Sequence, residues 1–196
     1  MASISVAGDS SGSISIAAPS AAGSGVLTLP TGTDTLVGKA TTDTLTNKTL
    51  GAGTVFPAGA VLQVVSASTS TQVSSSSATF IDSGLTATIT PTRNTSKILV
   101  LVSQSVIRTA ASAGTYVNIK AFRNSTDLGY VGFGILYTNT ALNMYSSVSA
   151  NLLDSPATTS ATTYKTQFNS ASATASVSCQ PDNIAVSYIT LMEIAG

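Results

Sequence analysis

The side chains that most often carry out acid–base and nucleophilic chemistry are missing or isolated in this chain. None of its 196 residues is a histidine, so it lacks the most common general base, the most common metal ligand and every histidine-dependent triad. It has 31 serines, but the sequence places no evident base beside any of them to activate a nucleophile. We therefore predict that the protein is not an enzyme and needs no cofactor.

The acidic residues are spread along the chain rather than clustered. Each of the seven aspartates lies at a predicted turn or strand end, where its side chain can accept hydrogen bonds from nearby backbone N–H groups. No group of Cys, Asp and Glu residues has the spacing of a metal site, so we predict none. The enzymatic alternative that stays open is a pair of carboxylic acids from distant segments, as in glycoside hydrolases.

Two other features have simple structural interpretations. The segment from Gly129 to Gly134, GYVGFG, superficially resembles a phosphate loop but lacks the following Lys-Ser/Thr and a strand-to-helix context. We interpret it as a strand whose glycines permit close packing. The single cysteine, Cys179, cannot form an intrachain disulfide and is interpreted as a small apolar strand residue, consistent with synthesis in a reducing cytoplasm.

Tyrosine is the remaining residue type that could bind a ligand. Exposed tyrosines in loops can stack on sugars or anchor a protein interface, although most of the six here are expected to pack inside the fold or between subunits. Tyr137 and Tyr145 bracket the predicted loop around Thr138–Thr140 and are our candidate ligand contacts.

The composition indicates a protein made for association. Only 8% of the residues are charged and the net charge is zero, whereas an ordinary soluble domain has roughly 25% charged residues. The surface must consist largely of serine and threonine, and a chain without net charge tends to associate. We expect no nucleic-acid binding, because there is no basic cluster. No apolar run approaches the ~20 residues of a membrane span, so we expect no membrane insertion, and we identify no signal peptide.

The elements begin with an apparent hairpin. SISVA (residues 3–7) and SISIA (13–17) alternate polar and apolar residues, and Gly8–Gly12 between them is rich in turn residues. A third short strand is predicted from Gly23 to Pro30. So small a hairpin is marginally stable in water and needs partners. The next segment, from Thr33 to Ala60, contains a near-repeat (TDTLVGK, TDTLTNK) and is predicted to be an extended connector.

From Val61 onward, apolar segments of strand length follow one another. Leu85–Thr90 alternates apolar and polar residues, and Ser83-Gly84 before it is predicted to be a turn after the strand 78–82. Lys97–Ser103 is apolar on both faces, which predicts a central strand covered on both sides. Residues 141–153 could form an amphipathic helix, but their serine content favours a strand. The pattern predicts an all-β sandwich.

The phrase running from Leu27 through Thr33–Gly38 to Ala40–Leu50 resembles one that is common in structural proteins of tailed bacteriophages. The body from Val61 also looks like the C-terminal β-domains of such proteins. The resemblance implies a homotrimeric virion appendage whose N-terminal part attaches to the particle and whose C-terminal knob faces outward. It carries over no catalytic residues. Because this chain is short, with little shaft, the resemblance favours a compact spike or a capsid decoration protein.

These observations define one expectation and one alternative. We expect an extended assembly arm, residues 1–57, followed by a jelly-roll-like antiparallel β-sandwich, residues 58–196. The protein would be a virion surface protein, assembled in the host bacterial cytoplasm, with copies of itself and other capsid or tail proteins as partners. The alternative is a receptor- or glycan-binding module that contacts the host surface. The candidate assembly contacts in the arm are its apolar residues Ile4, Val6, Ile14, Ile16, Leu27, Leu29, Leu36 and Leu45.

Overall fold

The chain divides into two units, Met1–Leu50 and Gly51–Gly196, and each is described by itself. The computed structural model describes residues 3–7, 11–17, 54–109, 114–172 and 175–196. The boundary expected between residues 57 and 58 stays a prediction. The predicted contacts Leu27, Leu29, Leu36 and Leu45, the third short strand and the connector up to residue 53 lie outside the described residues.

The N-terminal unit contains the predicted hairpin. Strands β1 (Ser3–Ala7) and β2 (Ser13–Ala17) pair antiparallel, with Ile4 opposite Ile16 and Val6 opposite Ile14. Short strands in the arm are therefore confirmed. That these four apolar residues contact neighbouring chains stays a prediction.

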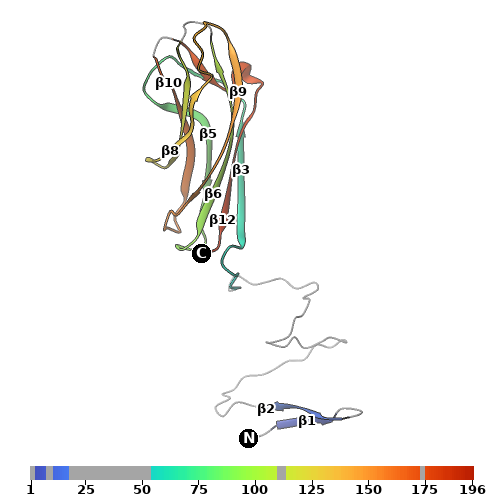
Figure 1. The fold of residues 1–196 in the computed structure, drawn as a ribbon. Helices are drawn as coiled ribbons and strands as arrows, with labels where there is room; N and C mark the ends of the chain where they lie inside the picture. The colour runs from blue at the N-terminus through green and yellow to red at the C-terminus, as the bar shows by residue number, and fades with distance from the viewer. Residues whose placement is uncertain (1–2, 8–10, 18–53, 110–113, 173–174) are drawn as a thin grey trace. The chain divides into compact units, whose positions relative to one another are not determined.

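The second unit is built from strands in two antiparallel sheets (Figure 1). One sheet has the order β5-β10-β7-β8, and the other has the order β3-β12-β6-β11-β4 with β9 also paired to β6. The elements are β3 (Val61–Thr69), β4 (Val73–Ser75), β5 (Ile81–Ile89), β6 (Lys97–Arg108), β7 (Val117–Arg123), β8 (Thr126–Ile135), β9 (Met144–Asp154), β10 (Thr162–Ser170), β11 (Val177–Cys179), the 3-10 turn η1 (Pro181–Asn183) and β12 (Ser187–Ile194).

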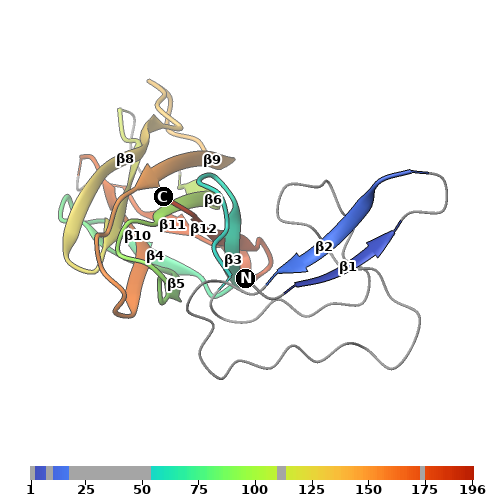
Figure 2. The same cartoon turned by 90° about the horizontal axis from the view of Figure 1, so that it is seen from below.

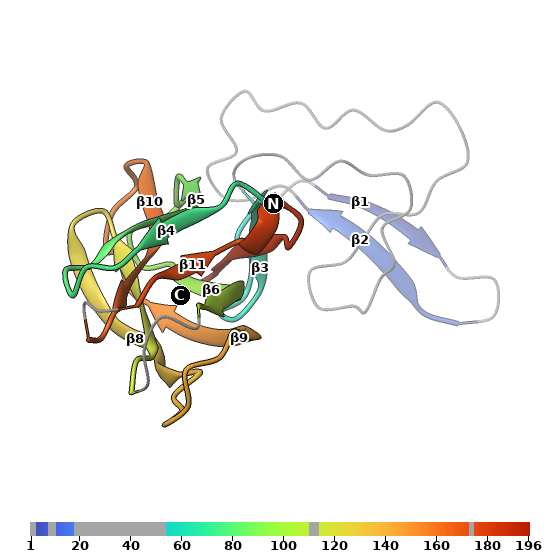
Figure 3. The ribbon, with the colours of Figure 1, turned by 90° about the horizontal axis from the view of Figure 1, so that it is seen from above.

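The strand order is that of a jelly roll. β12 pairs with residues 97–103 of β6 and β11 with residues 106–108, so these two strands share one edge of β6, while β9 pairs along the other edge. Along the chain, the strands pass repeatedly from one sheet to the other. Because β3 pairs with β12 and β4 with β11, the larger sheet is four strands wide, as the smaller one is, and the two sheets pack on each other. Figures 2 and 3, which look along the body, show β8, β10 and β5 on one side and β9, β6 and β3 on the other. The predicted all-β, jelly-roll-like sandwich is confirmed.

Strands β5 and β9 decide two local expectations. Ser83-Gly84 does not form a turn between two strands, because it lies inside the single strand β5. Gly84 has φ of +82°, and the register with β10 shifts beside it, so the glycine forms a β-bulge rather than a chain reversal. Residues 144–154 form strand β9, which confirms the strand rather than the helix.

Two apolar clusters fill the space between the sheets. The first includes Val102 of β6 and Tyr164 of β10, and the second includes Val106 of β6 and Phe168 of β10. On each of these strands one buried polar residue stands between the two clusters, Gln104 on β6 and Thr166 on β10. We call the set to which they belong the polar belt, and its members are the fully buried residues Ser83, Gln104, Thr166, Gln180 and Ser187.

The polar belt joins the two sheets by hydrogen bonds. The Thr166 hydroxyl donates to Gln104 Oε1 at 2.6 Å and lies 2.5 Å from the Ser83 hydroxyl. Gln180 accepts from Gln104 Nε2 at 3.0 Å and from the Ser187 hydroxyl at 2.8 Å, and it donates to the Ser83 carbonyl at 3.0 Å. These hydrogen bonds are needed because a buried polar group without a partner lowers the free energy of unfolding. The belt therefore fixes how the two sheets face each other.

The body begins and ends at the same end of the sandwich. Gly59 N donates to the Ala195 carbonyl and Ala195 N donates to the Ala60 carbonyl, both at 2.8 Å. We call this the base end. Strand β6 runs from it to the opposite end, where Arg108 pairs with Met144, and the antiparallel β9 runs back from there to the base end. The opposite end, which we call the loop end, carries the connections that include residues 114–116 and 136–143.

Glu193, at the base end, is a buried acid held by hydrogen bonds. Its carboxylate accepts from Gln63 Nε2 at 2.6 Å, from Thr92 N at 2.7 Å and from the Thr92 hydroxyl at 2.8 Å. Burial raises the pKa of Glu193, but the neighbouring Ser96, Gln63 and Thr92 together outweigh burial and hold that pKa below its ordinary value of 4.5. The ionised carboxylate therefore stabilises the fold.

The contribution of Glu193 should depend on pH in the acid range. A lowered folded-state pKa gives stability that is fully present above the unfolded-state pKa and is lost as pH falls through the folded-state value. We expect Glu193→Gln to lower the free energy of unfolding at pH 7, and we expect the difference from the unmodified protein to shrink below about pH 4.5. Urea unfolding of both proteins at several pH values measures it. A difference that stays constant or grows on acidification would contradict this account.

Candidate binding surfaces

The described residues leave the outer face of the sheet that contains β6 open to solvent. Lys97–Ser103 was expected to be covered on both sides. The strand is central, and Ile98 and Val102 are buried on its inner side, but Leu101 on the outer side is 38% exposed. Among the described residues the expected two-sided cover is wrong, because they leave the outer side of the strand open to solvent.

Three rows of outward-facing residues cross this sheet from β9 through β6 and β12 to β3. The first row is apolar on all four strands, the second has Leu101 at its centre, and the third consists of three serines and Tyr188. None of these residues carries a charge. We call them the neutral face: Leu153, Leu99, Met192 and Val64; Asn151, Leu101, Thr190 and Ser66; Ser149, Ser103, Tyr188 and Ser68.

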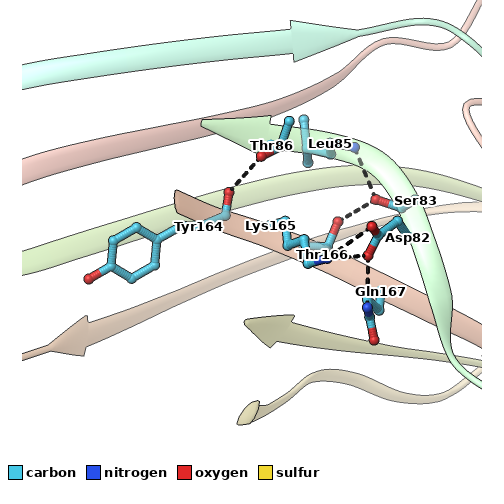
Figure 4. A network of polar contacts seen from close by, with 8 residues as sticks. All are labelled: Asp82, Ser83, Leu85, Thr86, Tyr164, Lys165, Thr166 and Gln167. Carbon is cyan, nitrogen blue, oxygen red and sulfur yellow. Dashed lines mark hydrogen bonds and ion pairs between the residues drawn. The ribbon is translucent and has the colours of Figure 1, made fainter. Parts of the chain in front are cut away.

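The outer face of the opposite sheet is different, since it carries ion pairs. On strands β5 and β10, Lys165 Nζ lies 2.8 Å from the Asp82 carboxylate, which also accepts from Gln167 Nε2 at 2.7 Å (Figure 4). Partial burial raises the pKa of Asp82, but the hydrogen bonds from Lys165 and Gln167 outweigh it and hold that pKa below its ordinary value. The outer face of this sheet therefore carries charged side chains, whereas the neutral face of the other sheet carries none.

A continuous run of aromatic rings also lies on this second sheet. Tyr130 contacts both Phe80, with ring centroids 6.1 Å apart, and Phe133, at 5.2 Å. Tyr116 contacts both Phe133 and Tyr137, each at 6.0 Å. All four contacts are edge-to-face, with ring planes inclined by 60° to 80°. We call the set Phe80, Tyr130, Phe133, Tyr116 and Tyr137 the aromatic stripe.

A bulge in β8 explains how two of these rings reach the same side. Residues three apart on a regular strand point to opposite faces, yet Tyr130 and Phe133 are 52% and 67% exposed while Val131 packs against the core. Gly129 and Gly134 have φ of +102° and +67°, and the register with β7 shifts repeatedly along this strand. The shift between Tyr130 and Gly132 is a bulge that brings both rings to the outer side, and Gly129 and Gly134 lie beside the two neighbouring shifts.

A single ion pair lies within the aromatic stripe. Lys120 Nζ is 5.0 Å from the centroid of the Phe80 ring and 4.8 Å from that of Tyr130, and it donates to the Asp127 carboxylate at 2.6 Å. The hydrogen bond to Asp127 raises the pKa of Lys120, and the same bond lowers the pKa of Asp127. Lys120 therefore remains a cation between two rings, an arrangement that favours their present orientation.

Of the two tyrosines selected from the sequence, Tyr137 lies in the connection that follows β8 and Tyr145 lies on β9 of the other sheet. Tyr137 belongs to the aromatic stripe, is 55% exposed and donates to Asn139 Oδ1 at 2.9 Å. The buried Arg108 holds the following segment, because its guanidinium donates to the carbonyls of Thr140 at 2.8 Å and Leu142 at 2.9 Å. Tyr145 is 60% exposed but lies on β9, opposite Ile107 of β6. That either residue binds a ligand stays a prediction.

The remaining stripe residues were not selected from the sequence. Strict alternation would have put Tyr130 and Phe133 on opposite faces, and the signal that could have corrected this was the three glycines around them, since glycines inside a strand often mark bulges. Phe80 and Tyr116 come from segments far from β8 in the sequence. Tyr116 comes close to β8 through the pairing of β7 with β8. Phe80 lies just before β5, at the opposite edge of the same sheet, and its ring contacts Lys120 of β7 and Tyr130 of β8.

Other kinds of site have little support in the described part of the chain. A depression of about 120 Å³ lies beside the Gly84 bulge, lined by Asp82, Leu85, Thr86, Lys165 and Thr166, which is smaller than the ~300 Å³ at which ligand pockets usually begin. Among the described residues, no three Cys, Asp or Glu side chains come together as a metal site would require. No helix in those residues has the length and apolar content to cross a membrane.

Comparisons with known proteins give only distant likenesses. No protein-family model and no curated protein matches the chain. Its backbone is similar to VP2 of infectious bursal disease virus, solved as a subviral particle, with a TM-score of 0.41 and 14% identity over 77% of this chain and 42% of VP2. A mutant VP2 solved as derived T=1 particles gives the same TM-score and identity, with 41% of VP2 covered. The chain thus spans less than half the length of these proteins, and likeness at this level assigns no family or function.

Proposed function

We propose that this protein is a non-enzymatic structural protein of a bacteriophage virion, a surface spike or capsid decoration protein whose copies associate through the neutral face. The observation that carries the proposal is the outer side of β6, where Leu99 and Leu101 lie in an uncharged surface that the described residues leave open. A sheet face without charge can pack against the same region of neighbouring copies around a threefold axis, because no ion has to be desolvated when it is buried. A second copy of this chain is therefore the partner that fits it.

Two further observations support a role in a particle. The phrase between residues 27 and 50 resembles that of tailed-phage structural proteins. The body begins and ends at its base end, so an arm that leaves from residue 54 and attaches to the particle would leave the loop end facing outward. In this proposal the arm, residues 1–57, anchors a homotrimeric body at the virion surface after assembly in the host cytoplasm.

Incorporation into particles tests this function. Tagged full-length chain and a tagged chain lacking residues 1–50, each supplied in trans during phage production, are compared by quantifying the tag in purified virions. We expect the full chain to be incorporated and the shortened chain to be reduced at least tenfold while remaining soluble, because the arm carries the attachment. Equal incorporation would contradict anchoring by the arm, and absence of the full chain from virions would contradict the virion role.

A further inference from the structure

The aromatic stripe is more exposed than packing alone requires. Phe133 and Tyr130 are more than half exposed, and the bulge between Tyr130 and Gly132 puts both rings on the outer side of the sheet. Large aromatic side chains left in water give up the free energy that burial would provide. A contiguous exposed patch of this kind marks a binding surface.

We propose that the aromatic stripe binds a neutral polysaccharide. One face of a sugar ring presents C–H groups, which pack on the electron-rich face of an aromatic ring. The stripe offers several rings in succession, with neighbouring centroids 5.2 to 6.1 Å apart, so it suits a repeating chain of sugars better than one small molecule. The phenol groups of Tyr130 and Tyr137 and the amide of Asn139 provide hydrogen bonds for sugar hydroxyls.

The charges around the stripe favour a ligand without charge. Lys120 is already paired with Asp127, and Lys165 with Asp82, so each of these cations has a carboxylate beside it. An anionic polysaccharide would have to compete with those carboxylates. A neutral chain leaves both ion pairs intact and covers only the rings.

This inference is independent of the proposed function. The stripe lies on the sheet opposite the neutral face, so both surfaces can be occupied at once. Association between copies through the neutral face leaves the stripe open, and repeating it on each copy would strengthen binding to a repeating polymer.

Affinity electrophoresis of the full chain tests the proposal. Native gels containing dextran, mannan or hydroxyethyl cellulose are compared with gels containing the anionic polymer alginate and with plain gels. We expect at least one neutral polymer to retard the protein, Phe133→Ala and Tyr130→Ala to weaken the interaction at least tenfold, and Tyr130→Phe to retain most of it. Both alanine positions are exposed, and an unchanged melting temperature verifies that the variants are folded.

Tyr145→Ala is the matched control: it removes an equally exposed ring from the other sheet, and the proposal places the polysaccharide on the stripe rather than at this second tyrosine selected from the sequence. It should bind as the unmodified protein does. The proposal is overturned if none of the three neutral polymers retards the protein or if only alginate does. It is also overturned if retardation survives both stripe variants, or if Tyr145→Ala abolishes it. The proposal is also contradicted if the protein binds no polymer but binds another protein, and Phe133→Ala abolishes that binding.

Discussion

Replacing Gln104 by leucine is expected to lower the free energy of unfolding by about 3 kcal/mol. Gln104 accepts from the Thr166 hydroxyl and donates to Gln180, and both partners are fully buried. Each buried polar group left without its partner costs about 1–3 kcal/mol. Because 1 kcal/mol corresponds to about 2–4 °C in a protein of this size, the midpoint of thermal unfolding should fall by roughly 10 °C.

The control for this prediction is the same change on the outer side of the other sheet. Gln167 donates to Asp82 at the surface, so Gln167→Leu removes a hydrogen bond that water can replace. We expect that variant to lose less than about 1 kcal/mol. If Gln104→Leu were as stable as the unmodified protein, the polar belt would not hold the two sheets together as described.

Introducing lysine at Leu101 and Leu153 should convert the associated protein into a monomer. Both side chains lie on the neutral face and are more than a third exposed in the single chain, so the substitutions leave its fold intact. In the interface, each ammonium group would be buried without a partner, at a cost of about 2–5 kcal/mol. Since about 1.4 kcal/mol is a factor of ten, the dissociation constant should rise at least a hundredfold.

Sedimentation velocity over a range of concentrations measures this effect. A double variant, Thr86→Lys with Thr88→Lys, is the matched control, because it adds the same two charges at exposed strand positions of the opposite sheet. It should associate as the unmodified protein does. If the variant with lysine at Leu101 and Leu153 kept its association, the copies would be meeting through another surface.

The alternation of residues in the sequence was sufficient to predict the general fold. Leu85, Ala87 and Ile89 alternate with threonines and are buried as the pattern predicts, and SISVA pairs with SISIA as a hairpin. The bulges were harder to predict, because Ser83-Gly84 is equally typical of a turn and of a bulge. Only the pairing of β5 with β10 on both sides of Gly84 distinguishes the two.

The polar belt and the two surfaces could not be predicted in full, because they depend on contacts between residues far apart in the sequence. Gln104 is visible in the sequence as a polar residue in an apolar strand, but its partner Gln180 lies 76 positions further along. The apolar outer side of Lys97–Ser103 was recognised, yet a sequence cannot say whether the same chain or another copy covers it. The stripe was missed because strict alternation separates Tyr130 from Phe133, whereas the bulges bring them to one side.

The central claim is that copies of this chain associate through the neutral face, and the mass of the unmodified full chain in solution tests it most directly. Sedimentation equilibrium should give a whole multiple of the chain mass, three for the predicted trimer, with little dependence on salt because no ion pair is formed across the interface. A single-chain mass at every concentration would contradict the claim.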